Sequence, residues 1–379
     1  MKAALSKSPN PIAGTRPKWG SLLPPLLILL VLSLAAVAPA CTPLPATSPA
    51  VTSTATLEET PGSDWYSLYF TDPDSPTAGS FRGGPDSDLA AAIRGAHQSV
   101  DAAIYHLNLW SIRNALIAAH NNGVNVRIVM ESDNMDEVEV QEMQAAGLTI
   151  LGDRRESLMH NKFVVIDQAE VWTGSMNFTI NGGYFNNNHL VRIHSTRLAE
   201  NYHREFEEMF TQDMFGDNQI ADTPYPILTL NGTQVETYFS PDDDTAARIV
   251  ALIHQAEKNI YFMAYSFTSD DIAAAMLEQA ATGVTVSGVF EEGQYYANTG
   301  TEYDRLLEAG LDVRLDGNGR NMHHKVIIID EQTVILGSYN FSRNAETRND
   351  ENTLIIHNPE IAAQFLVEFE RVFAKAPAK

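Results

Sequence analysis

Two segments of this chain carry the same polar residues at the same spacing. HNKFVVIDQAEVWTGSMNF runs from His160 to Phe178, and HHKVIIIDEQTVILGSYNF runs from His323 to Phe341. The two segments lie 163 residues apart and align without a gap. Self-similarity at this level indicates that one structural unit occurs twice in the chain.

Each segment opens with His-x-Lys, which places an imidazole and an ammonium two residues apart. His160 precedes Lys162, and His323 precedes Lys325. Residues i and i+2 of a β-strand point to the same face, so each pair is expected side by side inside a strand. His324 aligns with Asn161 and is expected to face away from the site.

A Gly-Ser-x-Asn sequence ends each segment. Ser175 and Asn177 stand in the first copy, and Ser338 and Asn340 in the second. A hydroxyl and an amide on one face can donate hydrogen bonds to an oxyanion. These four residues are therefore predicted to bind phosphate.

Two histidines and two lysines around one point suit the cleavage of a phosphodiester. The lysines would neutralise the non-bridging oxygens and stabilise the charge of the transition state. One neutral histidine could attack phosphorus while the other, protonated, gives its proton to the leaving oxygen. No metal or cofactor is required, because the lysines supply the positive charge.

The elements around the two motifs also repeat. Val100–Leu107 and Ile260–Phe267 are apolar and rich in strand-forming residues, and each is followed by a helix with an apolar stripe, a glycine and a second strand. Strands alternating with helices predict an α/β protein built from two pseudo-symmetric α/β/α sandwich halves, with one mixed sheet per half. The halves are expected at residues 63–225 and 226–379.

The N-terminus is typical of an export signal. A basic segment ends at Lys18, and an apolar run from Leu26 to Ala38 is followed by small residues. Cys41, the single cysteine, comes next, as the lipidated residue of a bacterial lipoprotein would; ordinary secretion and a retained membrane anchor are the alternatives. Residues 1–40 are thus expected to be a signal peptide, and the Pro/Ser/Thr-rich residues 41–62 a flexible tether. A single cysteine allows no internal disulfide and no cysteine-based metal site.

The formal net charge of −23 bears on the substrate. So acidic a surface repels polyanions at long range, which disfavours nucleic acid without excluding a local basic groove. Tethering to a bilayer would place the site beside phospholipid.

The repeated H-x-K-x-x-x-x-D-x-x-x-x-x-x-G-S-x-N pattern strongly resembles the motif of the phospholipase D superfamily. The likeness extends from Trp65 to the C-terminal helix. It implies one active site at the interface of the two halves, a phosphohistidine on His160, and His323 as acid and base. Asp167 and Asp330 match the catalytic motif's aspartate, for which a mainly structural, orienting role is expected.

One asymmetry between the halves follows from the same alignment. Glu351 falls opposite Asn188, at a position where family members often place an acid that hydrogen-bonds the histidine. On this basis Glu351 is expected to favour protonated His323, and Asn188 to leave His160 neutral.

These features together predict an exported, membrane-anchored phosphodiesterase that hydrolyses phospholipid and works as a monomer, since one chain holds both motifs. An extracytoplasmic endonuclease acting on DNA or RNA is the first alternative, and a phosphatidyl transferase the second. A non-enzymatic adhesion lipoprotein is the weakest alternative, because every motif position is filled in both halves.

Overall fold

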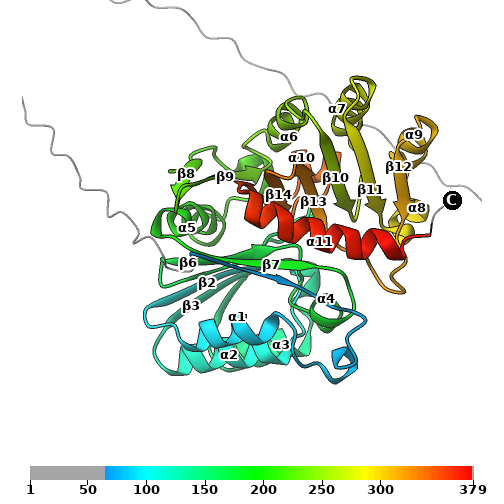
Figure 1. Cartoon of the computed structure of the whole chain (residues 1–379). Helices are drawn as coiled ribbons and strands as arrows, with labels where there is room; N and C mark the ends of the chain where they lie inside the picture. The colour runs from blue at the N-terminus through cyan, green and yellow to red at the C-terminus, as the bar shows by residue number, and fades with distance from the viewer. Residues whose placement is uncertain (1–64, 378–379) are drawn as a thin grey trace, which may run out of the picture. The chain divides into compact units, whose positions relative to one another are not determined.

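The computed structural model describes residues 65–377, which all belong to one unit of the chain (Figure 1). Cys41, the expected signal peptide and the expected tether lie outside the described residues. None of the described helices combines the length and apolar character needed to cross a membrane.

The first sheet has seven strands in the order β1-β7-β6-β5-β2-β3-β4. β2 and β4 pair in parallel with β3, and the other neighbours pair antiparallel, so the sheet is mixed, as expected. The strands are β1 (Tyr66–Phe70), β2 (Ser99–Ile104), β3 (Asn125–Met130), β4 (Thr149–Gly152), β5 (Lys162–Ile166), β6 (Glu170–Gly174) and β7 (His189–His194).

The second sheet repeats this arrangement with one extra edge strand, in the order β12-β11-β10-β13-β14-β15-β9-β8. Its first strand begins at Ile227, next to the expected boundary of the halves. The strands are β8 (Ile227–Leu230), β9 (Thr233–Ser240), β10 (Asn259–Ala264), β11 (Thr285–Phe290), β12 (Asp312–Leu315), β13 (Lys325–Ile329), β14 (Thr333–Gly337) and β15 (Glu351–His357).

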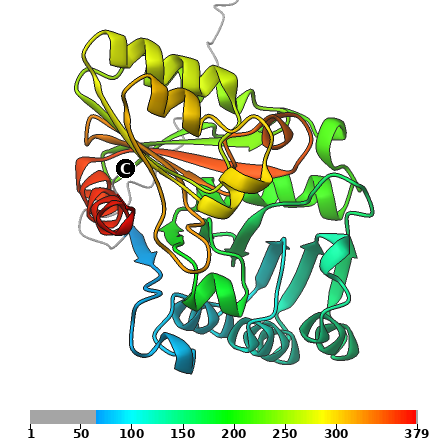
Figure 2. The same cartoon turned by 90° about the vertical axis from the view of Figure 1, so that its right-hand side faces the viewer.

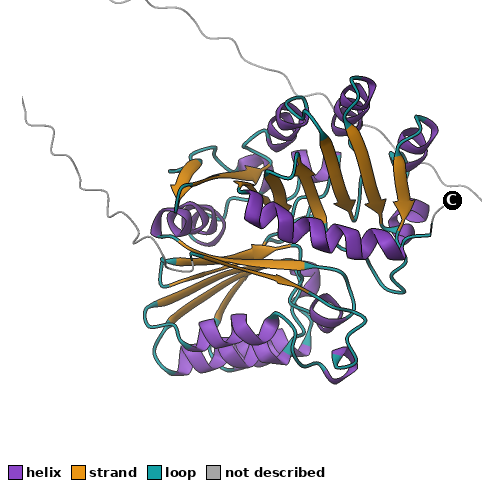
Figure 3. Cartoon of the chain, in the orientation of Figure 1, coloured by secondary structure: helices purple, strands orange, loops and turns teal. Residues whose placement is uncertain are grey.

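Helices cover both faces of each sheet, and two of them lie between the sheets (Figures 1 and 3). The inner pair is α5 (Thr196–Phe210) and α11 (Pro359–Lys375), whose apolar faces join the inner faces of both sheets in one core. The outer helices are α1 (Asp86–Arg94), α2 (Trp110–Asn121) and α3 (Val138–Ala145) on the first sheet, and α6 (Thr245–Ile253), α7 (Asp270–Ala281), α8 (Glu292–Ala297) and α9 (Tyr303–Glu308) on the second half. Two short helices, α4 (Ile180–Tyr184) and α10 (Arg343–Thr347), precede β7 and β15.

The predicted fold class is confirmed, with the refinement that the halves share their inner helical layer. The view turned by 90° shows the two sheets and the helices that flank them from the side (Figure 2). Each inner helix starts with a side-chain cap: Ser195 accepts the N–H of Leu198, and Asn358 accepts the N–H groups of Glu360 and Ile361. The inner helices α5 and α11 pack against the central strands β5 and β13, whose ends carry the motif residues.

Candidate active site

The two motif histidines lie immediately before the central strands rather than inside them. β5 begins at Lys162 and β13 at Lys325. The backbone before each strand pairs instead with the opposite half: the N–H of His160 donates to the carbonyl of Asp350 at 3.0 Å, and that of His323 to Asn187 at 2.9 Å. Each half therefore fixes the backbone of the other half's histidine, and the two motifs together form a single site.

The imidazoles also find their partners across the interface, which corrects the expected role of Glu351. Both carboxylate oxygens of Glu351 lie 2.8 Å from Nδ1 of His160. Nδ1 of His323 instead contacts the Asn188 amide oxygen at 2.9 Å and the Ser175 carbonyl at 3.0 Å. The prediction that Glu351 serves His323 and Asn188 serves His160 is wrong, because the halves exchange these residues.

The motif serines support the orienting residues instead of facing a substrate. The Ser338 hydroxyl donates to Glu351 at 2.6 Å, and the Ser175 hydroxyl donates to Asn188 at 2.8 Å. Both serines are fully buried. The predicted phosphate contact is thus replaced by a layer behind each histidine: Ser338–Glu351–His160 and Ser175–Asn188–His323.

The glycine before each serine allows this packing. A side chain at Gly174 would place its Cβ 2.4 Å from the His189 carbonyl oxygen, and one at Gly337 would place it 2.2 Å from that of Asn352. Both residues have positive φ values, 155° and 146°, which also favour glycine. The glycine therefore brings β7 or β15 close enough to orient the histidine.

The amides of Asn177 and Asn340 are the remaining predicted phosphate contacts. Both residues are partly exposed, and their Oδ1 atoms have no hydrogen-bond partner among residues 65–377. A phosphodiester anion could accept hydrogen bonds from the Nδ2 groups of these side chains, but it has no donor for their Oδ1 atoms. These two side chains remain candidates for binding phosphate.

Each motif lysine is held beneath its histidine. Nζ of Lys325 donates to the His323 carbonyl at 2.9 Å, and Nζ of Lys162 donates to the His160 carbonyl. Burial lowers the pKa of Lys162 to about 7, and burial together with Lys162 holds the pKa of Lys325 well below its usual range. A bound phosphodiester monoanion would favour protonation of both ammonium groups.

Two tyrosines that the sequence analysis did not select complete the site. Tyr105 lies 4.8 Å from the His160 ring and Tyr265 lies 4.4 Å from the His323 ring, centroid to centroid. The same rings lie under the lysines, 4.7 Å from Nζ of Lys162 and 4.4 Å from Nζ of Lys325. The repeat offered a signal, since both tyrosines stand at the same place after their apolar strands, β2 and β10.

Burial determines the protonation states of the site. Burial and the two lysines hold the pKa of His160 and of His323 well below the usual range. Burial also raises the pKa of Glu351 to about 7, although Lys162 opposes the shift. A neutral His160 can thus donate Nδ1–H to Glu351 and keep a lone pair on Nε2 for attack.

Asp167 and Asp330, counted with the catalytic motif, lie away from the histidines. They follow the far ends of β5 and β13, a strand of roughly 16 Å from the motif lysines. Asp167 accepts the N–H groups of residues 97–99, and Asp330 accepts those of residues 257–259. The geometry agrees with the mainly structural role expected for both residues, although they were counted among the catalytic residues: each carboxylate fixes the start of a neighbouring strand and contacts neither histidine.

His324 faces away from the site, as expected. Its Nε2 contacts Glu368 of α11 at 2.9 Å, and its Nδ1 lies 3.1 Å from Nδ1 of His189. Asn161 and Asn352 occupy the symmetric positions and are joined by a 2.7 Å hydrogen bond. Within the described part of the chain, no group of three His, Cys, Asp or Glu residues is arranged to hold a metal ion.

Comparison with known proteins decides the family. The family model "Cardiolipin synthase, PLD-like domain" matches residues 89–210 and 249–373, one stretch in each half. The chain belongs to the phospholipase D superfamily. Its curated relatives named phospholipase D and mitochondrial cardiolipin hydrolase place it among the phosphodiester hydrolases of that superfamily.

Among curated relatives, a phospholipase D of Rickettsia conorii is 32% identical over 164 residues, which are 42% of this chain and 80% of the relative. A mitochondrial cardiolipin hydrolase of Chlamydomonas reinhardtii is 30% identical over 135 residues, 36% of this chain; this chain spans only 60% of that relative. Among solved structures, the phosphatidylserine synthase of Haemophilus influenzae is 14% identical with a TM-score of 0.56, covering 77% of this chain and 87% of its own. That likeness shows the shared two-half fold alone.

Proposed function

We propose that this protein is a phospholipase D-type enzyme that hydrolyses phospholipid through a phosphohistidine on His160, without a metal ion. The observation that carries the proposal is the unequal pairing of the two histidines. His160 has a carboxylate on Nδ1, whereas His323 has only neutral oxygens there. A carboxylate makes the imidazole a better nucleophile and stabilises the positive charge that the imidazole gains on bonding to phosphorus.

In the first step, Nε2 of His160 attacks phosphorus and the bond from phosphorus to the leaving alcohol breaks. His323 has a lowered pKa in the free protein, and the negative charge of the bound phosphodiester favours its protonated form. Protonated His323 gives its proton to the departing oxygen. Lys162 and Lys325 neutralise the non-bridging oxygens, and Asn177 and Asn340 are placed to donate to them. Tyr105 and Tyr265 hold the histidines from the side of the rings.

In the second step, water attacks phosphorus and the bond to Nε2 of His160 breaks. His323, now neutral, takes a proton from the water and returns to its starting state. The products are the free alcohol and a phosphate monoester, which for a phospholipid is phosphatidic acid. The positive charge needed at phosphorus comes from the two lysines.

Phospholipid is the proposed substrate. This agrees with the names of two curated relatives, a phospholipase D and a mitochondrial cardiolipin hydrolase. The net charge of −23 also disfavours a polyanion such as nucleic acid. We further propose an exported protein, lipidated at Cys41 and active as a monomer, because the N-terminal sequence has the features of a lipoprotein signal and one chain supplies both motifs.

The test is headgroup release from mixed phospholipid vesicles, run beside cleavage of single-stranded DNA and RNA, with EDTA and with His160→Ala as the control. Release that survives EDTA and disappears in the variant supports the proposal. Nucleic-acid cleavage with intact vesicles would replace phospholipid by nucleic acid as the substrate. Incorporation of labelled palmitate that Cys41→Ser abolishes would support the lipid anchor.

A further inference from the structure

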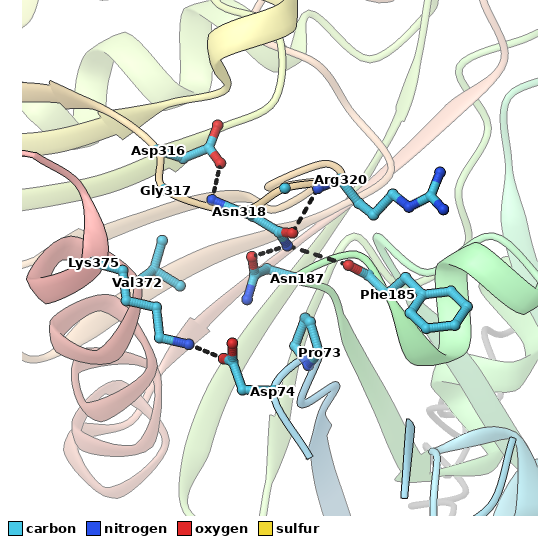
Figure 4. Close-up of a pocket in the computed structure, with 11 residues that line it drawn as sticks. Pro73, Asp74, Phe185, Asn187, Asp316, Gly317, Asn318, Arg320, Val372 and Lys375 are labelled. Atoms are coloured by element: carbon cyan, nitrogen blue, oxygen red, sulfur yellow. Dashed lines mark hydrogen bonds and ion pairs between the residues drawn. The ribbon is translucent and has the colours of Figure 1, made fainter. Parts of the chain in front are cut away.

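A cavity of about 320 Å³ lies beside the backbone that holds His323 (Figure 4). One wall is the loop Asp316–Arg320, which leads from β12 towards the second motif. Another wall residue is Asn187, whose carbonyl accepts the backbone N–H of His323. The cavity therefore directly adjoins the segment that positions His323.

The polar part of the lining is balanced in charge and rich in both donors and acceptors. It consists of two carboxylates, two cations and two amides: Asp74, Asp316, Arg320, Lys375, Asn187 and Asn318. An ion pair between Lys375 and Asp74 closes one side (Figure 4). Such a lining suits a small polar molecule and disfavours an acyl chain.

Asn187 directs an unused donor into this cavity. The residue is only 4% exposed, and its Oδ1 accepts from Nδ2 of Asn318 at 2.6 Å. Its own Nδ2 makes no hydrogen bond with another residue in the range 65–377, and Figure 4 shows this nitrogen pointing into the space between Asp74 and Val372. This nitrogen can donate to an acceptor on a ligand in the cavity.

The symmetric position next to His160 is closed. Arg155 and Asp350 stand there in place of Asn318 and Asn187 and form an ion pair. The connection after α5 packs onto this pair: Gly216 donates its N–H to Asp350 at 2.6 Å, and the Phe215 ring lies 5.7 Å from the Arg155 guanidinium. The cavity that remains beyond this connection, about 450 Å³, has only acids as its charged lining.

The two sides of the site therefore differ in a way that matches the proposed reaction. In an in-line displacement the leaving group departs on the side opposite the nucleophile, which is the side of His323. Resting on the proposed function, we infer that the cavity beside Asn187 binds the leaving alcohol, and that this alcohol is a polar headgroup with hydroxyl or ammonium groups, such as glycerol or an amino alcohol.

Filling the cavity tests this inference. Gly319 borders it, and a Cβ there would meet no atom within 4 Å, so Gly319→Phe adds a ring without a backbone clash. Gly95→Phe adds the same ring at the end of α1, where the nearest atom would be 3.4 Å away, and serves as the matched control. Asp74→Asn, at an exposed side chain, removes one charge with almost no change in shape.

The full-length protein is assayed on phosphatidylglycerol, phosphatidylethanolamine and phosphatidylmethanol, which share the phosphatidyl part and differ in the leaving alcohol. We expect Gly319→Phe to lower kcat/KM for the first two by at least about tenfold and to leave phosphatidylmethanol unchanged. Asp74→Asn should change the preference between glycerol and ethanolamine, and Gly95→Phe should change none of the three values.

Equal losses on all three lipids, or no loss on any, would overturn the inference, because the cavity would then not distinguish leaving alcohols. A wild-type protein that released headgroup from none of the lipids, phosphatidylmethanol included, would overturn the proposed function and this inference with it. Turnover of phosphatidylmethanol by the wild type separates the two failures: it is present when only the inference fails and absent when the proposed function fails.

Discussion

Glu351 distinguishes two histidines that are otherwise in equivalent positions. Its carboxylate reaches Nδ1 of His160 from the opposite half, while Asn188 gives His323 an uncharged acceptor. Because Glu351 has a pKa raised to about 7, it is ionised above pH 7 and loses its charge as the pH falls below that value. The nucleophile should therefore weaken on the acidic side.

Glu351→Gln tests this at the level of one residue. The amide keeps an acceptor for His160 but carries no charge, so we expect kcat to fall by about 100-fold at pH 8. The acidic limb of the pH–rate profile near pH 7 should disappear, while the alkaline limb remains. An acidic limb that persisted unchanged in the variant would contradict the assigned role.

Lys162→Met should separate function from stability. Burial lowers the pKa of Lys162 from 10.5 to about 7, so the unfolded chain binds the extra proton between those values. This cost to folding is fully present below pH 7 and fades as the pH rises from 7 to 10.5. The variant should be inactive yet more stable than wild type by about 0.5–2 kcal/mol at pH 7, with a smaller difference at pH 9.5. Urea unfolding at both pH values measures this, and a less stable variant at pH 7 would contradict it.

At the scale of the elements, two hairpins fix the central strands. The turns after β5 and β13 have positive φ at both central residues: 51° and 52° at Asp167 and Gln168, and 53° and 57° at Asp330 and Glu331. This is the type I′ geometry, for which Asp-Gly is a preferred sequence. The turn geometry and the backbone N–H groups that donate to the carboxylate therefore account for the aspartate without a catalytic role.

Asp167→Ala should lower stability and spare the chemistry. It removes an acceptor for three backbone N–H groups, so we expect a loss of about 1–3 kcal/mol in the free energy of unfolding. The kcat of the folded variant should stay within about twofold of wild type, since the site is a strand away. A large fall in kcat with unchanged stability would restore Asp167 to the catalytic set.

Gln168→Gly is predicted to act in the opposite direction. Gln168 adopts a left-handed conformation that glycine accepts without steric cost. The free energy of unfolding of the variant should therefore be about 1 kcal/mol higher than that of the wild type. Thermal unfolding and an activity assay at one pH suffice, and a lower Tm would contradict the prediction.

The sequence predicted these elements and most of the site because the repeat kept its spacing. The offset of 163 residues located both His-Lys pairs and the equivalence of Glu351 with Asn188. It could not show that Glu351 crosses to His160, because an internal alignment describes each half alone. Tyr105 and Tyr265 escaped notice because they are 160 residues apart and belong to strands that were interpreted only as buried.

At the scale of the whole molecule, the two halves form one site only when packed together. Each histidine takes both its backbone and its imidazole partner from the other half. The shared layer of α5 and α11 therefore supports catalysis as well as folding. Both lysines have lowered pKa values without a ligand, so anion binding should be coupled to proton uptake.

Dimethyl phosphate, a monoanion across the neutral range, can measure this coupling. At ten times its Kd it should stabilise the protein by about 1.4 kcal/mol, and its Kd should rise between pH 6.5 and 8.5 as Lys162 loses its proton. Thermal shifts at several pH values give the Kd, and Lys162→Met should flatten the dependence. A Kd independent of pH in the wild type would contradict the coupling.

The most direct test of the account is to locate the covalent intermediate. Protein mixed with phospholipid is quenched in alkali, where phosphohistidine survives, and its peptides are analysed by mass spectrometry with and without EDTA. The account predicts a phosphatidyl adduct on His160 that EDTA does not reduce and that Glu351→Gln diminishes. An adduct on His323, or turnover with no adduct on either histidine, would contradict it.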